Sequence, residues 1–200
     1  MPFNNSNSFS YAPFDLIHSE IWGLAPIPTE GGSRYFVIFV NDFFRYTWIY
    51  LLHHRSELVS IYQTFHKKIE TQFNHTVKSF RLDNAQEYND KSFLSFLDSH
   101  GTPTQRSCPY TSQQNGHAER KHRHILDVVY TFLISGSLPK RFWGEAALTT
   151  MYTINRIPSP TTYNKSSFEL LYGQTPNYSS LPVFGCACFV SLPPHEQTKL

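Results

Sequence analysis

The chain has 200 residues, a hydrophobic fraction of 40% and a formal net charge of +2. Its length fits one α/β domain with extensions, and its 17 Phe, 12 Tyr and 3 Trp indicate a globular protein rather than a disordered one. No apolar run approaches the roughly 20 residues that cross a bilayer, and the N-terminus lacks a secretory-signal pattern. The cysteines, Cys108, Cys186 and Cys188, lack the spacing of a disulfide framework, so we expect a reduced, intracellular chain.

The first half of the chain predicts strands. Residues 1–13 are rich in Asn and Ser without hydrophobic periodicity, and we expect a flexible lead-in there. Three strands follow at 14–22, 35–40 and 46–52, and because they are consecutive they predict an antiparallel meander. The unbroken apolar run at 35–40 is typical of a strand covered on both faces.

The rest of the chain alternates helices with strands. Ser56 is a plausible N-cap for the first helix, whose apolar residues recur at helical spacing. Gly136 is expected to end the long basic helix. The predicted elements are a helix at 58–73, a strand at 77–82, a helix at 93–97, a strand at 102–107, a helix at 115–133, a helix at 142–155, a short helix at 168–172 and a strand-like run at 186–192.

This order predicts one α/β layered fold, a five-stranded mixed sheet flanked by helices. We divide the chain into the lead-in at 1–13, a core domain at 14–157 and a loop-rich extension of that core at 158–200. Two acids stand out within the core. Asp83 ends a predicted strand, and Glu119 lies in the first turns of the basic helix, with 35 residues between the two acids. Carboxylates from a strand end and a helix can converge on Mg²⁺, which prefers oxygen ligands.

The segments HSEIWG, RYFVIFVNDFFRYTW, RLDNAQEY, PYTSQQNGHAERKHR, LPKRFWGEA and NRIPSP occur in this order. Together they resemble the integrase core of Ty1/copia-type LTR retrotransposons, in the DDE integrase and transposase superfamily. The resemblance runs from about Phe14 to the end of the chain. It implies an RNase H-like fold and the two reactions of DNA integration, 3′-end processing and strand transfer.

The resemblance also implies a catalytic and metal site. Residue by residue, the family's three acids fall on Glu20, Asp83 and Glu119, which would hold two Mg²⁺ or Mn²⁺ ions. Glu20 departs from the family, which has Asp there, and its extra methylene moves the carboxylate by about 1–1.5 Å. We expect no zinc site, because closely paired Cys or His ligands are lacking. The family's upstream zinc module is also missing, which suggests a fragment.

The same helix and the loop before it suggest a DNA-binding surface. The densest cationic cluster surrounds Glu119, and the preceding loop carries amides and an aromatic that suit stacking and hydrogen bonding to nucleic acid. The residues expected to bind nucleic acid are Tyr110, Gln113, Gln114, Asn115, Arg120, Lys121 and Arg123. The partners implied are the DNA ends of the element, target DNA and further copies of the chain, with a nuclear location if the protein is functional.

Two other interpretations remain open. Departures from the family cluster at the functional segment, at Glu20, Ala85, Gln86 and Ser112, so the chain could be a catalytically dead relic that folds and binds nucleic acid without chemistry. A further alternative is an RNase H-like nuclease or a host-adopted DNA-binding protein. The basic cluster alone is equally compatible with a solvated helix face.

Overall fold

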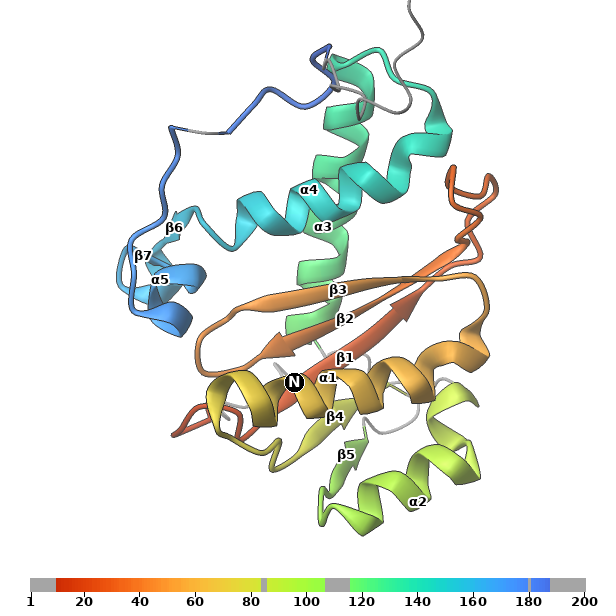
Figure 1. Ribbon diagram of the computed structural model, residues 1–200, viewed down its shortest axis with the longest axis vertical. Coiled ribbons are helices and arrows are strands. Elements are labelled where there is room, and N and C mark those ends of the chain that lie inside the picture. The colour runs from red at the N-terminus through yellow and green to blue at the C-terminus, as the bar shows by residue number, and fades with distance from the viewer. Residues whose placement is uncertain (1–9, 84–85, 107–115, 180, 188–200) are drawn as a thin grey trace, which may run out of the picture.

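The computed structural model describes residues 10–83, 86–106, 116–179 and 181–187. Its centre is a five-stranded mixed sheet in the order β3-β2-β1-β4-β5 (Figure 1). The strands are β1 (Ile17–Trp22), β2 (Tyr35–Asn41), β3 (Thr47–Leu52), β4 (Phe80–Leu82) and β5 (Thr104–Arg106). The first three pair antiparallel, and β4 and β5 continue the sheet in parallel from β1. The predicted meander and mixed sheet are confirmed.

Helices cover both faces of this sheet. Helices α1 (Leu58–Phe73) and α2 (Lys91–Ser99) pack on one face, where Phe39 and Phe80 lie in the buried core. Helices α3 (Gly116–Ser135) and α4 (Trp143–Ile154) pack on the other face, against Ile38 and its neighbours (Figure 1). Strand β2 supplies side chains to both cores, which is why its sequence is apolar without alternation.

Strands β1 and β4 begin three residues later than predicted, for local reasons. Phe14 has φ of 61°, so the extended backbone begins only at Ile17. Val77 is buried before the start of β4, and its carbonyl accepts a hydrogen bond from Thr102 Oγ1 instead of joining the ladder. The prediction of Ser56 as the N-cap of α1 is wrong, because Ser56 lies inside a 3-10 turn that precedes the helix. In this turn the Glu57 carboxylate accepts a hydrogen bond of 3.0 Å from the backbone N–H of His54.

The described part beyond α4 contains only short elements of secondary structure. A hairpin of β6 (Pro158–Ser159) and β7 (Lys165–Ser166) leads into α5 (Ser167–Tyr172), which confirms the short helix. Most of the predicted run at 186–192 lies outside the described residues. None of the described helices has the length and apolar character to cross a membrane.

Candidate metal and nucleic-acid site

Two of the predicted acids occupy matching positions on neighbouring strands. Strands β1 and β4 run parallel with Ser19 opposite Leu82, so the next residues, Glu20 and Asp83, leave the paired segment side by side. Side chains alternate along a strand, and Ile21 and Leu82 belong to the α1 face of the sheet. Glu20 and Asp83 therefore point to the α3 face.

The third acid arrives on the helix that crosses this face. Glu119 lies in the first turn of α3, and His122 follows it at i+3 on an adjoining side of the helix. Nδ1 of His122 is 3.3 Å from Oε1 of Glu20, so α3 passes directly over the Glu20 position of β1. The register and the crossing helix thus bring all three elements to one edge of the sheet.

The three acids lie on elements that meet at this edge, but their donor atoms are not gathered into one cluster. Within the described ranges, a trio of potential ligands whose donor atoms all lie within 4.8 Å of one another occurs at His66, Glu70 and His100, and not at Glu20, Asp83 and Glu119. The assignment of the three acids as metal ligands therefore stays a prediction that rests on register and motif.

The acids nevertheless fit a divalent cation chemically. The Glu20 side chain is 16% exposed, and its Oε2 is buried without a hydrogen-bond partner among the described residues. An unpartnered buried oxygen costs free energy, and a cation would remove that cost. Because the donor set consists of carboxylate oxygens, it suits hard ions such as Mg²⁺.

The predicted cations differ in their surroundings. Arg120 and Arg123 are exposed, as a surface that meets a phosphate backbone requires. Lys121 is partly buried, and burial followed by the nearby charge of Arg45 lowers its pKa. The basic cluster is therefore not a uniformly solvated helix face, because one of its members turns toward the body of the protein.

A buried polar network anchors the start of α3 to the sheet. Asp42, which is fully buried, lies 3.0 Å from His18 Nε2 and 2.9 Å from Arg45 Nη1. Burial alone would raise the pKa of Asp42, but hydrogen bonds from His18 and the Ser10 backbone, with the Arg45 charge, hold it well below its usual range. Asp42 is thus fully engaged in structure, which agrees with leaving it out of the predicted ligand set.

His117 joins this network from the first turn of α3. Arg45 Nη1 lies 3.1 Å from His117 Nδ1, and because arginine can only donate, Nδ1 must accept. His117 is therefore neutral with its proton on Nε2. Burial first, and then the charges of Arg45 and His18, lower the pKa of His117 to about 4.

Sequence reasoning missed these partners. The contact of His122 with Glu20 has one signal in the sequence, the i,i+3 spacing of His122 from Glu119. The contact of His117 with Arg45 depends on where α3 crosses the sheet. The contacts of Asp42 with His18 and Arg45 depend on how the turn after β2 folds back beside β1. Spacing along the chain gives neither arrangement. The predicted DNA-binding residues Tyr110, Gln113, Gln114 and Asn115, and the departures Ala85 and Ser112, lie outside the described residues.

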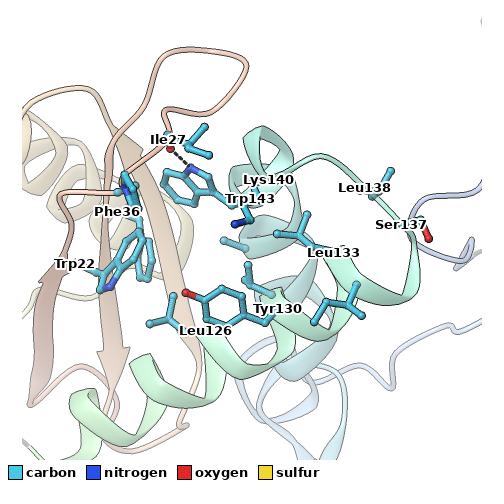
Figure 2. A pocket seen from close by; sticks show the side chains of 15 residues that line it. Trp22, Ile27, Phe36, Leu126, Tyr130, Leu133, Ser137, Leu138, Lys140 and Trp143 are labelled. Carbon is cyan, nitrogen blue, oxygen red and sulfur yellow. Dashed lines mark hydrogen bonds between the residues drawn. The ribbon is translucent and has the colours of Figure 1, made fainter.

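A cavity of about 500 Å³ adjoins the carboxylate edge (Figure 2). Leu126 in its wall lies seven residues after Glu119, on the same side of α3, and Trp22 lies two residues after Glu20 on β1. Trp143 closes one side, and its Nε1 donates to the Ile27 carbonyl at 2.9 Å. The described lining residues include no carboxylate, so this cavity offers no carboxylate ligand to a cation.

A family model described as "Integrase core domain" matches residues 10–112. The chain belongs to the integrase core domain family. This membership agrees with the fold, because a central mixed sheet covered by helices on both faces is the RNase H-like architecture of integrase cores.

The integrase core has relatives among Ty1/copia retrotransposon polyproteins. It is 39% identical over 200 residues to the retrovirus-related Pol polyprotein from transposon RE1 of Arabidopsis thaliana, covering 100% of this chain and 13% of that protein. It is 36% identical over 198 residues to the Pol polyprotein from transposon TNT 1-94 of Nicotiana tabacum, covering 99% of this chain and 15% of that protein. The chain thus spans only a small part of the length of these relatives.

Solved structures share the fold of this integrase core. The simian T-cell lymphotropic virus intasome in complex with PP2A regulatory subunit B56 gamma contains a chain with a TM-score of 0.67 and 15% identity, over 96% of this chain and 62% of that one. The HTLV-2 integrase catalytic core domain in complex with magnesium, in a trimeric form, gives a TM-score of 0.58 and 13% identity, over 80% and 98% of the two chains.

Proposed function

We propose that this chain is the catalytic core of a retrotransposon integrase that performs 3′-end processing and strand transfer on the DNA of its element. The observation that carries the proposal is the placement of Glu20 and Asp83 directly after the paired residues Ser19 and Leu82 of parallel strands, under the helix that bears Glu119. In both reactions a hydroxyl oxygen, first of water and then of a DNA 3′ end, attacks a phosphodiester without a covalent enzyme intermediate.

Glu20, Asp83 and Glu119 would hold Mg²⁺ or Mn²⁺, with two ions expected. When bound, such ions stabilise charge on the attacking and leaving oxygens. The protein's own part is to fix the acids. The contact with His122 holds one oxygen of Glu20, while the other stays free of hydrogen bonds from the described residues. Magnesium in the HTLV-2 integrase core, which shares the fold, supports this choice of cation.

DNA would lie along the exposed side of α3. Arg120 and Arg123 are placed to contact phosphates next to the scissile one, and Tyr110 and Asn115 would contact the processed DNA end. The intasome and trimeric assemblies of the two structural neighbours support further copies of this chain as partners. With chromosomal DNA as the target, the working location would be the nucleus.

The test is a strand-transfer assay of this chain on oligonucleotides that carry the ends of its element, with Mg²⁺ and with Mn²⁺. We expect joined products that disappear in Asp83→Asn and Glu119→Gln and persist in Asp98→Asn, which alters an exposed acid of α2. Product formation that survives Asp83→Asn would overturn the assignment of the metal ligands.

A second function is favoured by one observation, the longer side chain at position 20. If that side chain prevents metal binding in the required geometry, the domain folds and binds DNA without chemistry. Metal-dependent joining that appears only in Glu20→Asp would establish this catalytically dead relic, whereas joining by the unaltered chain would exclude it.

A further inference from the structure

Two histidines and one glutamate meet on the sheet face away from α3. His66 and Glu70 lie one turn apart on α1, and His100 caps the C-terminal end of α2. One donor atom from each lies within 4.8 Å of the other two. His66 is buried and His100 is exposed, so the group reaches from the core to the surface.

The spacing of these groups is that of ligands around one ion. His66 Nδ1 lies 3.4 Å from Glu70 Oε1. Tetrahedral Zn²⁺, with bonds of about 2.0–2.1 Å, separates its ligand atoms by about 3.4 Å. The His66 and His100 rings have centroids 4.6 Å apart at 66°, close to the separation of about 5 Å that two imidazoles on one such ion require.

The hydrogen bonds around both histidines leave nitrogens available. His100 Nδ1 lies 2.9 Å from the Phe96 carbonyl, and because a carbonyl only accepts, Nδ1 carries the proton. The lone pair of His100 is therefore on Nε2, and the backbone fixes the ring orientation as for metal-binding histidines. Nε2 of His66 is buried and has no hydrogen-bond partner among the described residues, so it can carry the proton of the neutral ring and leave the lone pair on Nδ1, the nitrogen that faces Glu70.

We propose that His66, Glu70 and His100 bind a divalent transition-metal ion, with Zn²⁺ as the best match, and that this ion joins α1 to α2. Imidazole ligands select zinc-like ions over Mg²⁺, and water would complete the coordination. Our sequence prediction of no zinc site considered closely spaced ligands, whereas this group forms only when α1 and α2 pack together. The site lies across the sheet from the carboxylate edge and is independent of the proposed function.

The test is thermal unfolding of the metal-stripped chain during a Zn²⁺ titration. Saturating Mg²⁺ is present throughout, so that any site of carboxylate oxygens is already occupied. At a hundredfold excess of Zn²⁺ over its Kd we expect Tm to rise by roughly 5–10 °C. No rise beyond that given by Mg²⁺ alone would overturn the proposal.

Variants locate the bound ion. His100→Gln and Glu70→Gln remove ligands that are not buried, so we expect both to fold and to lose the Zn²⁺-dependent rise in Tm. His53→Gln, which alters an exposed histidine elsewhere, should keep it. Isothermal titration should give one zinc per chain for the unaltered protein and His53→Gln. A rise that His100→Gln leaves intact would place the ion elsewhere and refute the site.

Discussion

The length of the side chain at position 20 gives the sharpest test of the carboxylate edge. Oε1 of Glu20 lies 3.3 Å from His122 Nδ1. Glu20→Asp withdraws the carboxylate by about 1–1.5 Å, which lengthens this contact to about 4.5 Å, beyond hydrogen-bond range. The shorter carboxylate would leave His122 and lie nearer to the backbone of β1.

We expect Glu20→Asp to increase the rate of 3′-end processing. A misplacement of about 1 Å in a catalytic group costs on the order of a hundredfold in rate, so correcting it should restore about that factor. The assay is single-turnover processing at saturating Mg²⁺, with Glu30→Asp as a matched control. Glu30 is an exposed acid paired with Arg141 at 3.0 Å, away from the edge. Glu30→Asp should leave the rate unchanged.

A double-mutant cycle separates the effect of side-chain length at position 20 from the effect of the contact with His122. If the His122 contact holds Glu20 away from the metal, His122→Gln alone should raise the rate, and the gains from His122→Gln and Glu20→Asp should not add. Equal rates for Glu20→Asp and the unaltered chain, at saturating Mg²⁺, would refute the argument that the extra methylene misplaces the carboxylate.

Asp42→Asn should destabilise the fold by about 3 kcal/mol, because it removes the buried anion that is paired with Arg45. Since the pKa of Asp42 is lowered on folding, the carboxylate stabilises the fold above about pH 4, and this stabilisation is lost as the pH falls further. The free energy of unfolding, from denaturant titrations, should therefore fall less steeply with decreasing pH in Asp42→Asn than in the unaltered chain. Arg123→Ala should weaken DNA binding on all sequences and reduce the salt slope by about 1, measured by fluorescence anisotropy. Gly144→Ala would place a Cβ 2.6 Å from Thr29 Cγ2 and should cost about 1–3 kcal/mol in chemical denaturation, whereas Gly31→Ala, with its nearest contact at 3.9 Å, should change stability by less than about 0.5 kcal/mol.

The sequence predicted the elements of the core because their signals are local. The apolar run of β2 and the helical periodicity of α1 follow from burial, and both elements lie within one or two residues of their predicted bounds. The hairpin of β6 and β7 was missed, since two-residue strands beginning at Pro158 carry no alternation to detect.

The candidate site could be predicted only in part. A motif identifies Glu20, Asp83 and Glu119, and the strand register then places the first two side by side. The contact of Glu20 with His122 depends on how α3 rotates and crosses β1, which is set by packing between distant segments. Pattern along the chain reports which face of a helix is apolar, but not which strand residue lies beneath each turn.

Different interactions hold the two ends of α3, and those at its first turn fix the position of Glu119. Its later turns pack through apolar residues such as Ile125 and Val129, whereas its first turn is tied to the sheet by neutral His117 and the charged pair of Arg45 and Asp42. The position of the Glu119 turn therefore depends on hydrogen bonds whose donors and acceptors are fixed. Because burial and the charge of Arg45 lower the pKa of His117 to about 4, His117 keeps its neutral form at neutral pH. A pH dependence of processing near neutrality would then not come from protonation of His117.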